Sequence, residues 1–266
     1  MITGNRISII GCGNIGLSIM QGLIDASYVP LKNITATRKN LEELALLNNY
    51  GVNLTSDNVE AVKQSDIILI AVKPYDIFAV LEEIKDHIDP KKHLLVSVAT
   101  GVSISQILDV IKVSLPIFRA MPNTAANVRE SLTCICHNGA SLEEIKLVKS
   151  LFDNIGTTIA IEENLMESAT ILGSCGIAYA LRFIRAMIQG GIQIGFDVKV
   201  ASAIVNQTVK GAAELLLVLK QHPEYEIDKV TTPKGCTIVG INEMEHNGFS
   251  SSLIKGIVAS YKEIEK

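Results

Sequence analysis

The segment ISIIGCGNIG, residues 7–16, decides how the first half of the chain folds. A short run of isoleucines leads into Gly11, Gly13 and Gly16, which follow the pattern G-x-G-x-x-G. Glycines at these places let the backbone approach a pyrophosphate, and the helix that follows offers free N–H groups and a favourable dipole. Because a buried strand precedes the pattern and a helix follows it, we predict a dinucleotide-binding βαβ unit here rather than a glycine-rich turn without a ligand.

Strand-like and helical segments continue to alternate downstream of this loop. Apolar runs without polar alternation predict strands that are covered on both faces, and apolar residues spaced by three and four predict the helices between them. The predicted strands cover residues 6–10, 33–37, 66–72, 94–99, 116–120, 132–136 and 157–160, and the predicted helices cover residues 15–26, 41–48, 77–87 and 103–111. This alternation predicts an α/β fold, a Rossmann-type doubly wound parallel sheet over residues 1–160.

The pattern changes after about residue 160. From there apolar residues recur at three and four, and no strand-like alternation is present. We therefore predict an all-helical domain over residues 161–266, with a helix that ends before Pro223 and a last helix over residues 250–263. Its apolar faces are more than a domain of this size can bury alone, so we expect at least a homodimer, formed through this domain.

The composition limits the kinds of partner. The chain has 266 residues, of which 48% are hydrophobic and 20% charged, and its net charge of −4 comes from interspersed acids and bases. The absence of a basic block argues against a nucleic acid or an anionic membrane surface, which leaves a small molecule. Arg182 and Arg185 interrupt the most apolar stretch, which predicts a buried core helix rather than a membrane span. Five scattered cysteines and no signal-peptide pattern favour a reduced, cytoplasmic protein.

The residues after the second predicted strand bear on the choice of cofactor. An NAD site usually has an acid there for the ribose 2′-OH, whereas this chain has Arg38 and Lys39 and no acid until Glu42. An arginine can form a two-pronged contact with a 2′-phosphate, and a lysine adds a point charge. Two solvated surface cations are the other interpretation. We favour NADPH as the cofactor and keep NADH as a possibility.

Further motifs follow the glycine loop in a fixed order: AVKP (71–74), SVATGV (97–102), RAMPNT (119–124), GSCGIAY (173–179) and TTPKGCTIVG (231–240). Together they resemble the motifs of the pyrroline-5-carboxylate reductase family over nearly the whole chain. The sequence departs from the family pattern at Ala125, Ile177 and Lys234. None of these departures removes a group that the resemblance places at the reacting atoms.

The resemblance implies an NAD(P)H-dependent oxidoreductase that reduces the C=N bond of 1-pyrroline-5-carboxylate to L-proline, the last step of proline biosynthesis. It implies a substrate site at Thr232, Gly235, Cys236 and Thr237, with the catalytic Thr237 hydroxyl near the ring nitrogen. With the glycine loop and the cation pair, the expected cofactor-binding residues are Gly11, Gly13, Asn14, Ile15, Gly16, Arg38, Lys39, Ala71, Val72, Lys73, Pro74 and Asn123. A capping turn with Thr237 as the N-cap is the structural interpretation of the same loop, and both can hold together. The resemblance also implies interlocked helical domains and a site shared between subunits.

Three alternatives remain open at this point. A related β-hydroxyacid dehydrogenase would need a base, usually a lysine on the first helix of the helical domain, and residues 162–194 contain no lysine. A non-catalytic NADP-binding sensor would keep the glycine loop but would not need residues 231–237. The run Cys134 to His137 has the residue types of a metal site, yet a core strand is the better interpretation, and we expect no metal.

Overall fold

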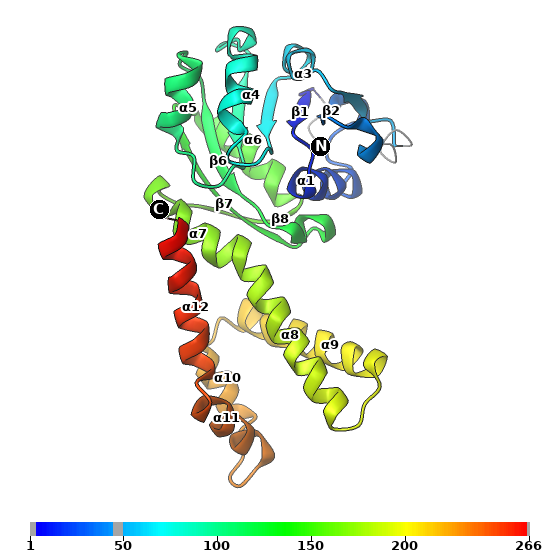
Figure 1. Ribbon diagram of the computed structural model, residues 1–266, viewed down its shortest axis with the longest axis vertical. Coiled ribbons are helices and arrows are strands. Elements are labelled where there is room, and N and C mark those ends of the chain that lie inside the picture. Colours follow the sequence, from blue (N-terminus) through cyan, green and yellow to red (C-terminus); the bar gives the residue numbers. More distant parts are fainter. Residues whose placement is uncertain (1–3, 45–49, 265–266) are drawn as a thin grey trace. The chain divides into compact units, whose positions relative to one another are not determined.

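The computed structural model describes residues 4–44 and 50–264 (Figure 1). The chain folds into two compact units. The first runs to Ile177 and also includes Ile264, and the second comprises Ala178–Glu263.

The described residues of the first unit form one eight-stranded sheet in the order β3-β2-β1-β4-β5-β6-β7-β8. Its strands are β1 (Ile7–Ile10), β2 (Ile34–Thr37), β3 (Asn53–Thr55), β4 (Ile67–Ile70), β5 (Leu94–Ser97), β6 (Ile117–Met121), β7 (Ser131–Asn138) and β8 (Gly156–Ala160). The order reverses direction at β1, where β2 lies on one side and β4 on the other. Ligands of doubly wound folds bind at such a switch point, beyond the carboxyl ends of the strands.

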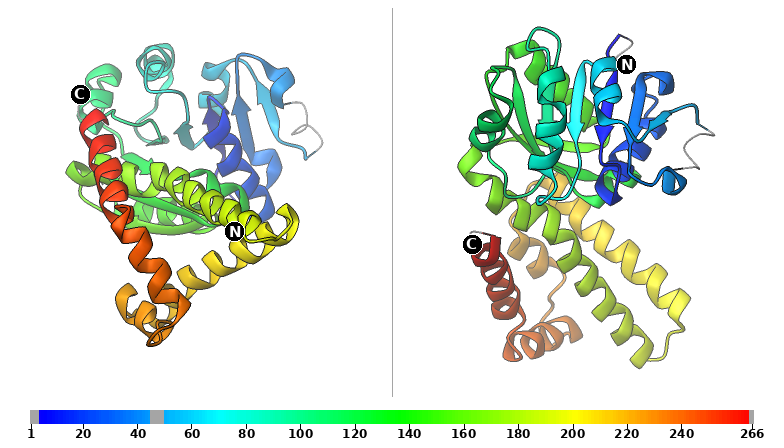
Figure 2. Two further views of the ribbon diagram at one scale, coloured as in Figure 1. Left: turned by 60° about the horizontal axis from the view of Figure 1, so that its bottom comes forward. Right: turned by 45° about the horizontal axis from the view of Figure 1, so that its top comes forward.

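Helices cover both faces of this sheet (Figures 1 and 2). The helices are α1 (Asn14–Asp25), α3 (Asn58–Gln64), α4 (Ile77–Ile84), α5 (Ile104–Ile111) and α6 (Leu142–Asp153). Alternate side chains of the central strands enter two separate cores, which is why a strand such as β4 is apolar throughout. Ile9 packs in the core that contains residues of α1 and α6, whereas Ile10 packs in the core that contains residues of α4 and α5.

The sheet confirms the predicted α/β class and differs from it in one pairing. We expected parallel strands throughout, but β7 runs antiparallel to β6. The connection between them, residues 122–130, contains the 3₁₀ turn Thr124–Val128 and is too short for a parallel pair, which needs a crossover of a dozen or more residues. The remaining strand pairs are parallel, including β7 with β8.

In the first unit, two helices and one strand were not predicted: α3, α6 and β3. β3 and α3 have only three and seven residues, too short for a clear period. α6 carried a readable signal, because Ser141 and Glu144 form a capping box at its start. The helix predicted over residues 41–48 is a 3₁₀ turn at Leu41–Leu44, and its remainder lies outside the described residues.

The helical region begins with a continuous helix that consists of α7 (Met166–Ala169), a π-helical turn (Thr170–Cys175) and α8 (Gly176–Gln193). The predicted domain boundary was residue 160, whereas the two compact units divide after Ile177. Polar contacts explain the difference, because Asn123 Nδ2 donates to the Gly173 carbonyl at 2.9 Å and Ser174 Oγ donates to the Pro122 carbonyl at 2.8 Å. The start of the helix therefore packs as part of the sheet unit.

The second unit is helical as expected. Figure 2 shows α8 and α9, yellow-green and yellow, joined by a short turn. The helices after α8 are α9 (Val198–Leu219), α10 (Pro223–Lys229), α11 (Cys236–His246) and α12 (Phe249–Ile264). By length and composition, Glu163–Gln193 is apolar enough to cross a membrane. We predicted a buried core helix, yet α8 has no buried residue in the single chain. Burial of this helix requires something outside the chain.

His93, just before β5, gives the fold a pH dependence. Its side chain is buried, and Nδ1 accepts a hydrogen bond from the Asp89 backbone N–H at 2.9 Å. Burial lowers the pKa of His93 below 6.5 and Lys92 adds to this, while Asp89 and Asp66 oppose it. The unfolded chain therefore takes up this proton at a higher pH than the folded chain does, so stability is lost as pH falls from about 6.5 toward the folded pKa.

We expect His93→Asn to reduce this loss, because the amide oxygen replaces Nδ1 as acceptor and does not titrate. The measurement is the melting temperature of both proteins between pH 8 and pH 5, a range chosen to span the histidine titration at about 6.5. A fall on acidification that is equally steep in both proteins would contradict the role of His93.

Candidate active site

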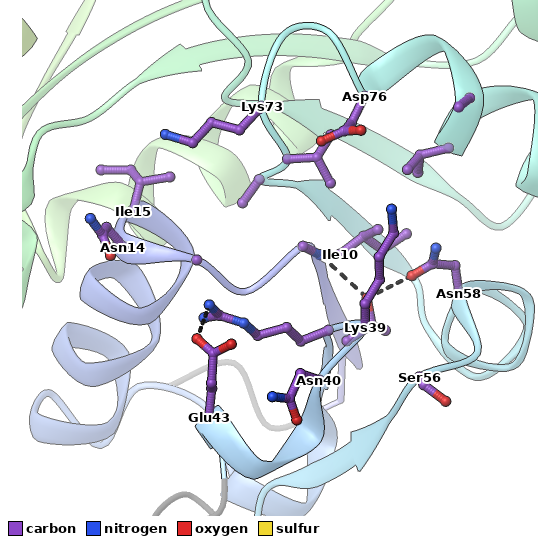
Figure 3. Close-up of a pocket in the computed structure, with 18 of the residues that line it drawn as sticks. Ile10, Asn14, Ile15, Lys39, Asn40, Glu43, Ser56, Asn58, Lys73 and Asp76 are labelled. Carbon is purple, nitrogen blue, oxygen red and sulfur yellow. Dashed lines mark hydrogen bonds and ion pairs between the residues drawn. The ribbon is translucent and has the colours of Figure 1, made fainter.

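A cavity of about 640 Å³ opens at the carboxyl ends of the strands beside the switch point (Figure 3). Four segments form most of its walls: the glycine loop after β1, the residues after β2, Ser56 and Asn58 after β3, and the residues after β4 with one face of α4. Thr124, beyond β6, also lines the cavity. Of the expected cofactor-binding residues, those that line it are Gly11, Gly13, Asn14, Ile15, Arg38, Lys39, Ala71, Val72 and Lys73. Pro74 and Asn123 are outside this lining, and Gly16 lies beneath it in α1.

The glycine loop has the conformation that a phosphate cradle needs. Gly11 has φ +80°, and a Cβ on it would lie 2.2 Å from Val72 Cγ1. Gly13 is the N-cap of α1 and provides no side-chain cap, so the first N–H groups of the helix have no side-chain partner there. Free N–H groups and the positive end of the helix dipole together favour an anion. Gly16 is buried in α1, where a Cβ would make ordinary van der Waals contact with Ala71 Cβ at 3.4 Å.

Arg38 lies across the glycine loop. Its Nη1 donates to the Cys12 carbonyl at 2.9 Å, and its Nη2 forms an ion pair with Glu43, drawn dashed in Figure 3. Lys39 follows it in the same wall. The predicted cation pair thus faces the cavity, together with an acid, Glu43, that the sequence did not assign to the site.

Cys12 is the one thiol within the glycine loop. Burial raises its pKa to about 12, although Arg38 opposes the shift. The thiol therefore stays protonated at neutral pH. A protonated, buried thiol is a packing group and not a nucleophile.

A chain of polar contacts supports the loop from the side of α3. The Gly11 backbone N–H donates to Thr37 Oγ1 at 3.3 Å, and Thr37 Oγ1 donates to Asn58 Oδ1 at 2.6 Å. Asn58 Nδ2 in turn donates to Glu83 Oε2 on α4 at 2.9 Å. Sequence reasoning missed Thr37, Asn58 and Glu83 because α3 was not predicted and their contacts join segments far apart in the chain.

The RAMPNT motif serves the structure around the site. Arg119 is buried, with Nη1 3.1 Å from Glu163 and Nη2 2.9 Å from Glu167. Asn123 is also buried, and its Oδ1 accepts from the Ala125 backbone N–H at 3.0 Å while its amide bonds the Gly173 carbonyl. Both side chains therefore tie β6 to the start of the helical region.

The expected substrate loop lies in the second unit. Gly235 is the N-cap of α11 and provides no side-chain cap. Its N–H donates to the Thr232 carbonyl at 2.9 Å, and a Cβ on it would lie 2.5 Å from Thr232 Oγ1. The expectation that Thr237 is the N-cap is wrong, because Cys236 is the first helical residue and Thr237 the second. The loop still presents a helix N-terminus with a hydroxyl beside it, an arrangement that suits a carboxylate.

The glycine cradle, the cations beside it and the helical second unit are typical of a dinucleotide-dependent oxidoreductase. Two family models match: NADP oxidoreductase, coenzyme F420-dependent, over residues 6–101, and pyrroline-5-carboxylate reductase dimerisation over residues 163–266. The chain belongs to the pyrroline-5-carboxylate reductase family.

Individual relatives agree with this assignment. Pyrroline-5-carboxylate reductase 2 of Dictyostelium discoideum is 42% identical over 98% of this chain and 92% of its own length. Reductase 1 of the same organism is 41% identical over 96% of this chain, and the chain spans about half (48%) of its length. The Plasmodium falciparum pyrroline carboxylate reductase with NADP bound superposes with a TM-score of 0.90 at 27% identity, covering 98% of this chain and 97% of that one.

A Coxiella burnetii pyrroline-5-carboxylate reductase gives a TM-score of 0.88 at 31% identity, covering 98% of this chain and 97% of that one. The alternative dehydrogenase class is more distant. The Mycobacterium tuberculosis 3-hydroxyisobutyrate dehydrogenase reaches a TM-score of 0.52 at 12% identity over 73% of this chain and 67% of that one. That likeness shows a shared fold only.

Proposed function

We propose that this chain reduces 1-pyrroline-5-carboxylate to L-proline with NADPH, and with NADH as a second cofactor. The observation that carries the proposal is the cavity at the switch point, where an uncapped helix N-terminus and the Arg38–Lys39 pair face the same space. This donor set fits a pyrophosphate and a 2′-phosphate. Family membership supplies the reaction class.

In the cofactor site, the glycine loop and the start of α1 hold the pyrophosphate, with Asn14 and Ile15 at the rim. Arg38 and Lys39 receive the 2′-phosphate. Residues 71–74 border the nicotinamide ribose from the end of β4, with Asn123 fixing the turn beyond β6. Bound NADPH supplies a hydride to the imine carbon, so the residues of the chain have only to bind, orient and place charge.

In the substrate site, the N-terminus of α11 with Thr232, Gly235 and Cys236 binds the carboxylate. The Thr237 hydroxyl lies near the ring nitrogen of the substrate and holds the proton of that nitrogen in place. An imine that is already protonated is a good electrophile, and its reduction leaves a neutral amine without any general base. This requirement agrees with a site whose polar groups are backbone N–H groups and a hydroxyl.

A second copy of the chain completes the enzyme. The dimerisation family model covers residues 163–266, and large apolar side chains along these helices are exposed in the single chain. Examples are Leu172, Leu181, Ile192, Leu217 and Val239. Burying such side chains against a partner accounts for the unburied α8, and we infer a homodimer or larger assembly whose active site combines residues of two subunits. We also infer a cytoplasmic location, which agrees with the free thiols of all the cysteines.

Thr237→Ala tests the substrate loop. We expect kcat/KM for 1-pyrroline-5-carboxylate to fall about 10- to 100-fold, the size of one hydrogen bond to a charged group. Thr237→Ser keeps the hydroxyl and should retain most of the activity. The affinity for NADPH, measured by fluorescence without substrate, should be equal in all three proteins. If kcat/KM fell as far in Thr237→Ser as in Thr237→Ala, the proposed role of the Thr237 hydroxyl would be contradicted.

The double variant Arg38→Ala/Lys39→Ala tests the choice of cofactor. We expect the Kd of NADPH to rise at least tenfold, while that of NADH changes less than twofold, because only NADPH carries the 2′-phosphate. The control is Lys91→Ala/Lys146→Ala, which removes two exposed cations outside the cavity lining. An unchanged ratio of the two Kd values would show that the cation pair does not read the 2′ position.

A further inference from the structure

In the wall of the cavity, an acidic side chain lies at the guanidinium of Arg38. Asp76, Glu83 and Glu43 all line the cavity, but they have different surroundings. Glu83 accepts from Asn58 on the side of α3 and α4, whereas Glu43 Oε2 pairs with Arg38 Nη2. Both members of this pair remain in contact with solvent, with 26% of the arginine and 51% of the glutamate side chain exposed. A ligand can therefore reach and separate them.

The fold fixes the glutamate at this place. The chain leaves β2 and turns at once through the 3₁₀ turn Leu41–Leu44. The Glu42 backbone N–H donates to Asn40 Oδ1 at 3.1 Å, which closes the start of the turn, and the fully buried Leu44 anchors its end in the core. Glu43 lies between these two anchors, and its carboxylate faces the cavity in Figure 3. The turn therefore holds the backbone of Glu43 beside the cavity, and the ion pair with Arg38 orients its carboxylate there.

We propose that Glu43 is the residue that sets the balance between NADPH and NADH, an inference that rests on the proposed cofactor site. In the free protein the Glu43 carboxylate is paired with the Arg38 guanidinium, the group to which a 2′-phosphate would bind. NADPH must displace this carboxylate and then tolerates its negative charge nearby, whereas a ribose 2′-OH can donate to it. Glu43 therefore weakens NADPH binding and supports NADH binding.

The Glu43 carboxylate can weaken NADPH binding in two ways, by occupying the Arg38 guanidinium or by direct repulsion of the phosphate. A variant of Arg38 distinguishes them. If Glu43 acts by occupying the guanidinium, its removal helps NADPH much more when the arginine is present than when it is absent. Simple repulsion between carboxylate and phosphate would give the same effect in both backgrounds. The difference between the two backgrounds is the coupling that a double-mutant cycle measures.

The test is fluorescence titration of the protein with NADPH and NADH, without substrate. Glu43→Gln keeps the size of the side chain and removes its charge, and Glu42→Gln removes the same charge from the neighbouring exposed residue outside the cavity lining. We expect the ratio of Kd for NADH to Kd for NADPH to rise about three- to fivefold in Glu43→Gln, as expected for a partly exposed ion pair, and to stay within twofold in Glu42→Gln. Adenosine 2′,5′-bisphosphate, which lacks the nicotinamide, should gain affinity like NADPH.

Three results would overturn the inference. The first is an unchanged ratio in Glu43→Gln, and the second is an equal rise in Glu42→Gln. The third is an equal gain for NADPH when Glu43→Gln is made in an Arg38→Ala background. If the wild-type protein binds neither NADPH nor NADH, the proposed function itself fails, and the inference fails with it. If the wild type binds both but the ratio does not respond to Glu43, only the inference fails.

Discussion

Gly11→Ala lowers the affinity for NADPH by more than about a hundredfold, the largest loss that we expect from a single methyl group in this chain. Two effects add at this position. The residue has φ +80°, a region that costs an L-residue roughly 1–2 kcal/mol. Its new Cβ would also lie 2.2 Å from Val72 Cγ1 and 3.1 Å from the Val72 backbone nitrogen, so the loop must move away from the wall after β4. Moving the loop changes the cradle that the pyrophosphate needs.

The matched control is Gly51→Ala. Gly51 has almost the same φ, +82°, but among the residues that the structure describes no atom lies within 4 Å of its ideal Cβ position. It therefore reports the cost of the backbone conformation alone. NADPH titrations and thermal unfolding of both variants separate the two effects. The account expects both variants to lose stability, Gly11→Ala more than Gly51→Ala, and only Gly11→Ala to lose NADPH binding. Gly11→Ala that folds and binds NADPH as tightly as the wild type would contradict it.

Gly156→Ala destabilises the sheet unit by at least about 3 kcal/mol. The residue opens β8 with φ +148°, which only glycine adopts readily. A Cβ there would lie 1.9 Å from the Ser131 carbonyl oxygen and 2.4 Å from the Ser131 nitrogen, both of them backbone atoms of β7. Backbone atoms in a paired strand cannot turn aside as a side chain can. The pairing of Ser131 with Gly156, the first of the β7–β8 register, must therefore break.

Urea unfolding gives the measurement, and Gly139→Ala is the control. Gly139 also has a positive φ, +71°, yet its Cβ would approach the Leu115 carbonyl oxygen no closer than 3.7 Å. We expect this control to lose only the roughly 1–2 kcal/mol of the backbone conformation. A Gly156→Ala protein as stable as Gly139→Ala would show that β7 and β8 are not paired as described.

The sequence predicts the first unit well where period and motif agree. The strand, glycine loop and helix over residues 7–25 were predicted together, because buried parallel strands leave long apolar runs and glycines mark the turn. The antiparallel β7 was not foreseen, since strand direction depends on the length of the connection and not on the strand itself. Short β3 and α3 carry too few residues for a period.

The site shows the same division. Residues that act through backbone conformation, such as Gly11 and Gly13, can be identified from the sequence because the chemistry restricts the residue type. Glu43 could not, since its place at Arg38 depends on a turn anchored by Leu44 in the core. Asn123 was expected to border the cofactor, and this stays a prediction. Its contact with the Ala125 N–H is a local cap that asparagine favours, whereas no local pattern predicts its bond to the distant Gly173 carbonyl.

The helical unit illustrates what a single chain leaves out. Its helices were predicted from the spacing of apolar residues, and the same spacing suggested that these residues are buried. In the single chain α8 has no buried residue, so the expected burial depends on the second subunit that the dimerisation family model indicates. Sequence period identifies an apolar face, but it does not say which surface covers that face.

The most direct test of the central claim follows NADPH absorbance and proline formation together, with purified protein and synthetic 1-pyrroline-5-carboxylate. We predict that one proline forms for each NADPH consumed, that NADH replaces NADPH with a lower kcat/KM, and that Gly11→Ala abolishes both. Tight NADPH binding without any proline formed from this imine would contradict the account. The glycine loop would then belong to a protein that binds the dinucleotide without carrying out this reaction.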